Sequence, residues 1–403
     1  MKDVYIVDIK RTPVGKFLGS LSGVAPSQLA APVINHLITT HKINPTDVQE
    51  VILGNILSAG HKQNIARQAA IHGGLPDTIP AYGINMVCGS GLKAINQSYV
   101  NIKAEVGEVY IAGGTESMSQ AAFALPYTAR GGVKMGDLKL TDTMIADGLT
   151  DAFHNYHMGI TAENIVAKLG LTREEQDTFA FASQQKAIKA QDAGFFKDEI
   201  IPVVIKGKKG DVVVEADEYI NRDTTLEKLA KLNPAFKKEG GTVTAGNSSG
   251  VNDGAAVALV ASANYVAKHN LKPMAKIVAI GQSGLDPAIM GLGPVSAINN
   301  LLKTTDISIN DVDIFELNEA FAAQSLGVIK ELCSKHKLNK EEFMAKVNIQ
   351  GGAIAIGHPI GSSGARVLTT LTHMLKRNKK KYGIASLCIG GGMGVAILVE
   401  NIN

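Results

Sequence analysis

Three segments in the first half of this chain resemble three segments in the second half, and they occur in the same order. Each of them contains a run typical of a buried strand, and the middle pair continues through a glycine-rich turn into a helix that opens with Ser-Gly. The pairs are residues 46–55 with 310–319, 83–95 with 347–368, and 108–117 with 382–394. This repetition predicts a duplicated α/β unit, although the general pattern of strand, turn and helix also gives loose matches.

The region between the two copies differs from both. Residues 121–241 are more polar and contain fewer runs typical of buried strands. Within them we expect an excursion over 126–142 and a hairpin that turns at 207–210. A helix is predicted over 172–194, because Thr172 can cap its first turn. We therefore expect a loop domain that covers the active face of the two copies.

Composition limits the classes of protein to which the chain can belong. With 403 residues, 45% hydrophobic and 19% charged, it is long enough for two or three globular domains. Its 40 basic and 37 acidic residues leave a net charge of +3, which gives no reason to expect nucleic acid as a partner. No apolar run reaches the roughly 20 residues that cross a membrane, so no membrane partner is expected. The N-terminal sequence has no signal or transit peptide character, and the cytoplasm is the expected location.

The cysteines indicate chemistry rather than disulfide bonding. The chain has three, an odd number, so at least one thiol stays free and a reducing compartment is expected. Cysteine and histidine pairs at zinc-binding spacing are missing from the sequence, so we expect no metal. Cys88 and Cys388 both lie in glycine-rich turns, NMVCGSGLKA and CIGGGMG. Cys333 lies on a predicted amphipathic helix, where a structural role is expected.

Cys88 has the setting of a nucleophile. It follows a predicted strand and precedes a helix from Leu92, and Gly89 and Gly91 permit a sharp turn and the close approach of a substrate. A helix N-terminus lowers the pKa of a thiol and stabilises an oxyanion. The alternative is a buried structural cysteine, which is the commoner role of a lone cysteine.

Cys388 ends another predicted strand. The backbone N–H groups of the glycines after it can form an anion-binding nest, and with a lowered pKa its thiol can act as a general base. The alternative is a nucleotide-type glycine loop with an incidental cysteine. That alternative is disfavoured, because the run lacks the following acidic residue and βαβ unit of a dinucleotide site.

His358 and Asn318 are candidates for supporting roles. His358 lies in a third glycine-rich turn, and a histidine is the usual base that activates a cysteine. The chain has ten histidines, however, and sequence spacing does not show which of them meets Cys88. Asn318 ends a predicted buried strand, where its amide can orient a water or polarise a carbonyl. The alternatives are a structural histidine and an N-cap for the next helix.

Together these motifs resemble the active-site motifs of the thiolases, in that family's order. They are NMVCGSGLKA (85–94), NEAFA (318–322), GGAIAIGHPIG (351–361) and CIGGGMG (388–394), and the resemblance covers essentially the whole chain. Residues 154–159, HNYHMG, and the Met-Val before Cys88 are most similar to the short-chain acetyl-CoA acetyltransferases.

The resemblance implies a role for each motif residue. Cys88 would take the acyl group as a thioester, and the backbone N–H groups of Cys88 and Gly390 would form an oxyanion hole. His358 would activate Cys88 and, with a water held by Asn318, bind the thioester oxygen of a second substrate. Cys388 would remove the α-proton of that second acetyl-CoA. The reaction would condense two acetyl-CoA into acetoacetyl-CoA and CoA, or run in reverse, with these thioesters as substrates and without a cofactor.

The coenzyme A site of the family also carries over. Arg222 would meet the nucleotide part and Ser249 the pantetheine, although Arg222 alone would more often be a solvated surface charge. His157 and Met158 would shape a pocket for a short acyl group. The other residues implied for this pocket are Leu149, Phe236, Ala245, Met290 and Phe321. One departure is an extra glycine within residues 237–246, which blurs the match near Phe236.

For the fold, the resemblance implies two similar βαβαβαββ halves in a five-layer αβαβα arrangement, together with the loop domain. Residues 1–120 and 250–271 would form the N-terminal half, 121–249 the loop domain that binds CoA, and 272–403 the C-terminal half. The family is dimeric or tetrameric, and residues 131–140 resemble its tetramer-forming loop. We therefore expect a homotetramer, a dimer of dimers.

Two other functions stay open. A broad-chain 3-ketoacyl-CoA thiolase would need room for a longer acyl chain where His157 and Met158 lie. A non-catalytic acyl-CoA-binding relative would have no need of both cysteines together with Asn318 and His358. The first leaves the enzyme class unchanged, whereas the second removes catalysis.

Overall fold

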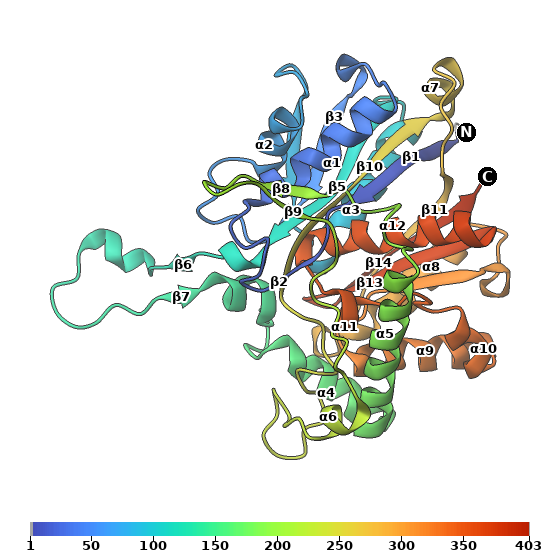
Figure 1. The fold of residues 1–403 in the computed structure, drawn as a ribbon. Coiled ribbons are helices and arrows are strands. Elements are labelled where there is room, and N and C mark those ends of the chain that lie inside the picture. The colour runs from blue at the N-terminus through green and yellow to red at the C-terminus, as the bar shows by residue number, and fades with distance from the viewer. Residues whose placement is uncertain (1–2, 403) are drawn as a thin grey trace.

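The computed structural model describes residues 3–402, and ten strands within them form one mixed sheet. These are β1 Val4–Arg11, β2 Gly15–Lys16, β3 Glu50–Gly54, β4 Ala81–Ile84, β5 Val109–Ser117, β10 Asn252–Ser262, β11 Ala275–Gly284, β12 Ile314–Leu317, β13 Tyr382–Ile389 and β14 Met393–Asn401. Their order is β12-β13-β14-β11-β1-β10-β5-β3-β4, and β2 pairs with β10 (Figure 1).

The sheet consists of two equivalent halves that meet where β1 pairs with β11. The first half has the order β1-β10-β5-β3-β4 and the second β11-β14-β13-β12. Both begin with antiparallel pairs and end with parallel pairs. A parallel bridge from Phe315 to Val347 stands where the first half has its β3–β4 pair. The predicted duplication is confirmed, because the paired sequence segments occupy equivalent elements of the two halves.

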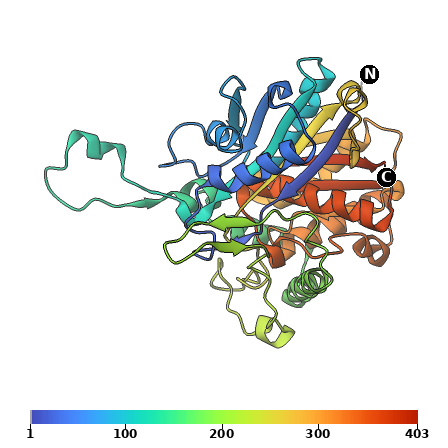
Figure 2. The same ribbon diagram turned by 45° about the horizontal axis from the view of Figure 1, so that its top comes forward.

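Helices pack in three layers around the two halves. The main helices are α1 Pro26–Thr40, α2 Ile65–His72, α3 Ser90–Lys103, α8 Gly293–Leu302, α9 Ala322–His336 and α12 Ile360–Asn378. Helices α3 and α12 pack together between the halves, where apolar residues from both form one core. Helices α1 and α2 cover the outer face of the first half, and α8 and α9 cover that of the second. The predicted αβαβα order is confirmed; Figure 2 shows the blue and red halves side by side.

The elements around the central layer are deeply buried. Strands β5 and β10 are buried along their whole length, as expected for strands with helices on both faces. Every residue of α12 from Ile360 to Leu375 is also buried. The turn at the N-terminus of α12 therefore lies in the interior, whereas the turn before α3 stays half-buried at Met86, Val87 and Cys88.

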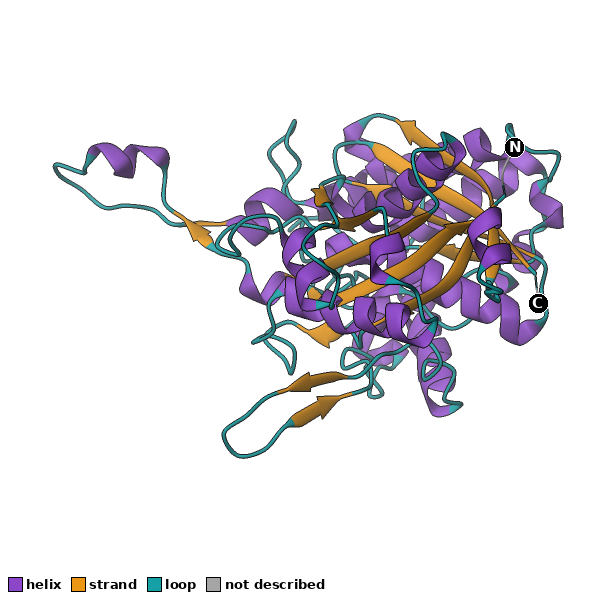
Figure 3. Ribbon diagram, turned by 90° about the horizontal axis from the view of Figure 1, so that it is seen from above, coloured by secondary structure: helices purple, strands orange, loops and turns teal. Residues whose placement is uncertain are grey.

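The region between the halves forms separate small elements. They are β6 Phe123–Ala124, β7 Thr141–Asp142, α4 Met158–Leu169, α5 Arg173–Asp192, β8 Val203–Ile205, β9 Val212–Val214 and α6 Leu226–Ala230. The predicted helix is confirmed as α5, which Thr172 and Glu175 cap reciprocally. The predicted hairpin is β8–β9. Residues between β6 and β7 project far from the body of the molecule (Figures 1 and 3).

The other short α-helices are α7 Ala263–Lys268, α10 Lys340–Ala345 and α11 Ala353–Ile356. The division into residues 1–120 with 250–271, 121–249 and 272–403 stays a prediction. Within residues 3–402, no helix is both long and apolar enough to cross a membrane.

Candidate active site

Cys88 lies in a strained turn between β4 and α3. The turn is a single 3-10 turn, Val87–Gly89, and Val87 has a φ of 44°, a left-handed conformation that is rare for a β-branched residue. Ser90 holds the turn, because its Oγ accepts a hydrogen bond from the N–H of Met86 (2.8 Å) and donates one to the carbonyl of Val87 (2.7 Å). Strain held in place by such bonds is typical of a functional site.

Glycines allow the turns that carry Cys88 and His358 to approach each other. A Cβ on Gly114, in β5, would lie 2.0 Å from the carbonyl oxygen of Gly361, and a Cβ on Gly91 would lie 2.9 Å from the same oxygen. These distances are too short for any side chain. The N-termini of α3 and α12 therefore meet backbone to backbone at the end of β5.

Cys388 is brought beside Cys88 from the second half of the sheet. A Cβ on Gly89 would lie 2.4 Å from Cδ1 of Ile389, the residue after Cys388. The Cys88 sulfur accepts hydrogen bonds from the backbone N–H groups of Gly390 and of Cys88 itself. A negative charge on Cys88 raises the pKa of Cys388, because the two thiols are close. The two thiols thus share one site, although 300 positions separate them in the sequence.

Both thiols are protonated in the free protein. Burial raises the pKa of Cys88 to about 11, and the N–H bonds from Gly390 and Cys88 offset only part of this rise. Burial likewise raises the pKa of Cys388. The expectation that these turns lower the pKa of a thiol is therefore wrong for the free protein, because lost hydration outweighs the helix N-terminus. A base must take the proton when Cys88 reacts.

His358 is oriented to be that base. Its backbone N–H donates to Oδ1 of Asn252 (2.9 Å), and its Nδ1 lies 2.6 Å from Oγ of Ser363. Since the Ser363 hydroxyl donates to the carbonyl of Pro359 (2.9 Å), Nδ1 carries the ring proton and Nε2 keeps its lone pair. Within residues 3–402, this Nε2 has no hydrogen-bond partner. Burial, with the nearby charge of Arg366, lowers the pKa of His358 to about 3, so the ring is neutral.

The side-chain amide of Asn318 is free to bind a ligand or a water. Asn318 follows β12, and its backbone N–H donates to the carbonyl of Ser386 (3.0 Å). The side chain is fully buried, and neither its oxygen nor its nitrogen has a partner among the described residues. The N-cap alternative is wrong, because α9 begins at Ala322 and its N-cap residue is Phe321. An unpartnered buried amide is costly unless a ligand completes it.

An apolar cluster of aromatic and methionine side chains lies beside Gly390, in the turn between β13 and β14 that follows Cys388. A Cβ on Gly390 would lie 3.5 Å from the sulfur of Met158. The His157 ring stacks on Phe236 at 4.5 Å, and Phe236 meets Phe321 edge-on at 6.0 Å between ring centroids. Met290 belongs to the same cluster as Met158, Phe236 and Phe321. The structure therefore places these predicted pocket residues together.

The remaining predicted contacts lie in three places. Leu149 packs with Cys88 in a small apolar cluster. Arg222 and Ala245 line a separate cavity of about 710 Å³, where the Arg222 guanidinium pairs with Asp192 (2.6 Å) on the exposed surface. Ser249 donates its backbone N–H to the carbonyl of Ala320, two residues after Asn318. An exposed ion pair is weak, so Arg222 remains available to a phosphate.

Three residues that support the site were not predicted from the sequence. Glu116, at the end of β5, accepts a hydrogen bond from the N–H of Gly361 (2.9 Å), and burial raises the pKa of Glu116 to about 7. Asn252 and Ser363 hold His358, as described above. The available signals were the position of Glu116 at a strand end and that of Ser363 in the motif HPIGSSG, but their partners are distant in sequence.

Comparison with known proteins adds independent findings. The model of the thiolase N-terminal domain matches residues 4–264, and that of the thiolase C-terminal domain matches residues 271–401. The chain is 52% identical to a probable acetyl-CoA acyltransferase of Staphylococcus epidermidis over 401 residues, and 52% identical to an acetyl-CoA acetyltransferase of Chromobacterium violaceum over 399 residues, with 99% of each chain covered.

Two solved structures extend the comparison to three dimensions. The crystal structure of the Bacillus anthracis acetyl-CoA acetyltransferase matches with a TM-score of 0.95 at 44% identity. That of human mitochondrial 3-ketoacyl-CoA thiolase matches with a TM-score of 0.93 at 41% identity. Each alignment covers 100% of this chain and 99% of the other.

Proposed function

The chain belongs to the thiolase family, and we propose that it catalyses acetyl transfer between two molecules of acetyl-CoA. The products are acetoacetyl-CoA and CoA, and the reverse reaction is thiolysis. One observation carries the proposal: Cys88 and Cys388 lie close together, the turn that carries His358 packs against the turn that carries Cys88, and the buried side chains of His358 and Asn318 keep polar atoms without a partner among residues 3–402. The acetyl-CoA acetyltransferases that resemble the chain over its full length support the same activity.

In the first half-reaction, Cys88 forms an acetyl-enzyme. His358 takes the thiol proton on Nε2, the sulfur attacks the carbonyl carbon of acetyl-CoA, and the bond from that carbon to the CoA sulfur breaks. The backbone N–H groups of Cys88 and Gly390 stabilise the oxyanion. Cys388 gives its proton to the departing CoA sulfur and becomes a thiolate. The protonated His358 and this thiolate then balance each other's charge.

In the second half-reaction, the Cys388 thiolate removes a methyl proton from the second acetyl-CoA. Burial raises the pKa of Cys388, so its thiolate is a strong base. His358 and a water held by Asn318 bind the enolate oxygen. The enolate carbon attacks the acetyl group on Cys88, the bond to the Cys88 sulfur breaks, and that sulfur recovers its proton from His358. All four groups return to their starting states.

The proposed substrate has a short acyl chain. His157, Met158, Phe236 and Phe321 lie together near Gly390, in the turn that follows Cys388, and a longer acyl chain would need room there. We expect thiolysis of acetoacetyl-CoA to exceed thiolysis of a long-chain 3-ketoacyl-CoA by at least tenfold in kcat/KM, since buried apolar contacts discriminate by about this much. A preference for the long chain would make the protein a broad-chain 3-ketoacyl-CoA thiolase.

A binding role without catalysis is the third possibility, and it has its own test. In that case acetoacetyl-CoA would protect Cys88 from alkylation while no turnover occurs. We expect both protection and turnover, because the base, the nucleophile and the oxyanion-binding groups are all present.

The proposal extends to the setting in which the enzyme works. We infer a homotetramer, a dimer of dimers, acting in the cytoplasm on CoA thioesters without a further cofactor. Free cysteines support a reducing compartment. The projecting segment between β6 and β7 supports assembly, because it exposes apolar side chains that a partner subunit would cover. They are Phe123, Leu125, Tyr127, Val133, Met135, Leu138 and Leu140.

A further inference from the structure

Glu319, the residue after Asn318, is a buried carboxylate that accepts hydrogen bonds from three partners. The hydroxyl of Ser183 donates to Oε2 (2.7 Å), the side-chain amide of Asn348 to Oε1 (2.8 Å), and the backbone N–H of Ile354 to Oε2 (3.2 Å). Glu319 is only 1% exposed. Because all three partners donate, the site is built for an acceptor with no hydrogen of its own.

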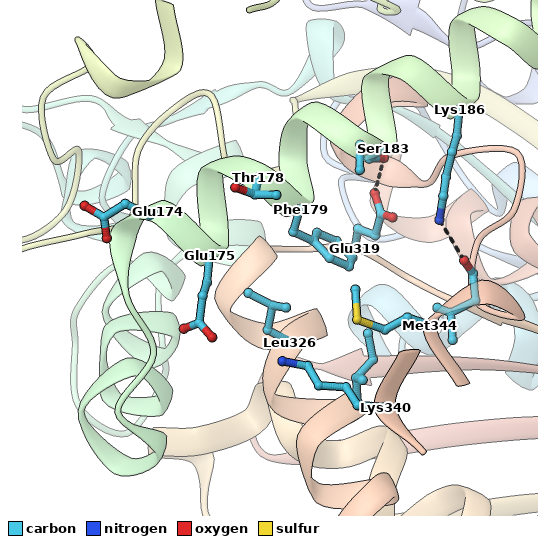
Figure 4. Close-up of a pocket in the computed structure, with 13 residues that line it drawn as sticks. Glu174, Glu175, Thr178, Phe179, Ser183, Lys186, Glu319, Leu326, Lys340 and Met344 are labelled. Carbon is cyan, nitrogen blue, oxygen red and sulfur yellow. Dashed lines mark hydrogen bonds between the residues drawn. The ribbon is translucent and has the colours of Figure 1, made fainter. Parts of the chain in front are cut away.

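The three donors belong to three different segments of the chain. Ser183 lies on α5, in the region between the halves; Asn348 follows α10; and Ile354 lies on α11, the short helix that leads into His358. Figure 4 shows Ser183 and Glu319 facing each other at the wall of a pocket of about 360 Å³, which α5, α9 and α10 border. The carboxylate of Glu319 therefore connects the end of β12 both to the segment before His358 and to α5.

The contacts around this carboxylate leave little freedom. The N–H of Gly352 donates to Oγ of Ser183 (3.0 Å), and a Cβ on Gly352 would lie 2.2 Å from Cδ of Glu319. Asn348 also exchanges two hydrogen bonds of 2.8 Å with the backbone of Leu317, the last residue of β12. Any shift of Glu319 would thus displace both the end of β12 and the first turn of α11.

We propose that Glu319 is a positioning residue that fixes the Asn318 amide relative to the His358 ring. Glu319 acts on Asn318 because the two residues are adjacent in the chain, and on His358 because it binds Ile354 of α11, the helix that leads into His358. Its hydrogen bond from Ser183 connects both to α5. This inference rests on the proposed function, in which the two groups bind the same enolate oxygen. A misplacement of about 1 Å in such a pair lowers a rate by about 100-fold.

Glu319→Gln tests this role by two half-reactions measured separately. Glutamine keeps the volume but presents an NH₂ group, so at least one of the three hydrogen bonds is lost. Rapid quench and mass spectrometry measure the rate of Cys88 acetylation. Exchange of the acetyl-CoA methyl protons with D₂O measures the rate of enolate formation. We expect exchange to fall about 10- to 100-fold. Acetylation falls less, because it requires His358 but not Asn318.

A second variant and a control complete the design. Ser183→Ala removes one donor and leaves Asn348 and Ile354 in place. The ratio of the exchange rate to the acetylation rate should therefore fall by a smaller factor than in Glu319→Gln. The double variant should lose no more than Glu319→Gln alone, because both remove one interaction. Glu341→Gln, on the exposed surface of α10, should match the wild type.

Two results would overturn the inference. One is an unchanged ratio of exchange to acetylation in Glu319→Gln, or in Ser183→Ala if the first variant does not fold. The other is an equal loss in both half-reactions, which a purely structural role would produce. A wild-type protein that lacks both half-reactions would instead contradict the proposed function.

Discussion

At the residue scale, the reactivity of Cys88 depends on its neighbours rather than on an ionised resting state. Burial raises the pKa of its thiol to about 11 and lowers that of His358 to about 3. The pair is therefore neutral before substrate binds, unlike a thiolate–imidazolium pair. A neutral pair avoids the cost of two buried charges, and His358 still offers Nε2 to the thiol proton.

A neutral Cys88 predicts a characteristic pH dependence of alkylation. In the free enzyme, the rate at which iodoacetamide modifies Cys88 should rise about tenfold per pH unit between pH 7 and 9, because only the thiolate reacts. Mass spectrometry assigns the modified cysteine. A plateau below pH 8 would show an ordinary or lowered pKa of Cys88 and contradict the raised pKa described above.

The neutral His358 predicts how stability depends on acid. Its pKa is lowered from an ordinary value near 6.5 to about 3, so the unfolded chain binds a proton first. The contribution is complete above pH 6.5 and is lost as pH falls toward 3, by up to about 1.4 kcal/mol per pH unit. Urea denaturation should show a steeper loss of the free energy of unfolding between pH 6 and 4 in the wild type than in His358→Gln. Parallel curves would show that His358 is not buried in its neutral form.

The proposed reacting residues were predicted from the sequence, but their protonation was not. Cys88, Cys388 and His358 stand out because glycines surround them, and that pattern is local. The raised pKa values arise from desolvation by segments distant in sequence, which no local pattern reveals. The same holds for Ser363 and Asn252, since a hydrogen-bond partner is defined only once the turns have met.

At the scale of elements, the close contacts of three glycines, Gly89, Gly91 and Gly114, determine how closely the turns of the candidate site approach one another. Gly114→Ala would place a Cβ 2.0 Å from the carbonyl oxygen of Gly361, which is backbone and cannot rotate away. We expect a destabilisation of roughly 1–3 kcal/mol, seen as a lower midpoint of thermal unfolding, together with a lower kcat, because Gly361 lies in the first turn of α12, the helix after His358.

Gly23→Ala is the matched control for this change. Among the described residues, no atom outside its immediate neighbours lies within 4 Å of a Cβ at Gly23. It should leave both the unfolding midpoint and kcat close to those of the wild type. If Gly114→Ala behaved like this control, the backbone contact between β5 and α12 would not position the site.

Elements with strong local signals were predictable from the sequence, and elements defined by pairing were not. Helix α5 followed from Thr172, which can cap its first turn, and the strands followed from their apolar runs. Helix α11 has no such signal, and the strand expected at Val347 is only a single parallel bridge, because neighbours rather than their own residues determine the form of both. The order of the layers came from the resemblance, and the structure confirms it.

At the scale of the whole molecule, duplication explains how the site is assembled. The turn before α3 carries Cys88, and the equivalent turn before α12 carries His358. Since α3 and α12 pack together in the central layer, the two equivalent turns meet there. Cys388 and Asn318 then come from the ends of β13 and β12 in the second half. Residues far apart in the sequence thus reach one place through the symmetry of the fold.

The projecting segment predicts the state of assembly. Replacing residues 125–140 by Asn-Gly should close the hairpin between β6 and β7 with a two-residue turn, because Ala124 pairs with Thr141, and should leave the body folded. We expect the wild type to be a tetramer by light scattering and the shortened protein to be a dimer with an unchanged unfolding midpoint. A molar mass that does not respond to the deletion would show that this segment does not join subunits.

The division of labour between the two cysteines is the central claim, and mass spectrometry of the protein after mixing with acetyl-CoA tests it most directly. The wild type and Cys388→Ser should both carry an acetyl group on Cys88, and Cys88→Ala should carry none. Condensation should occur in the wild type only, with each variant slowed by several orders of magnitude, as in other cooperating catalytic sets. An acetyl group that persists in Cys88→Ala, or that is absent from Cys388→Ser, would contradict the account.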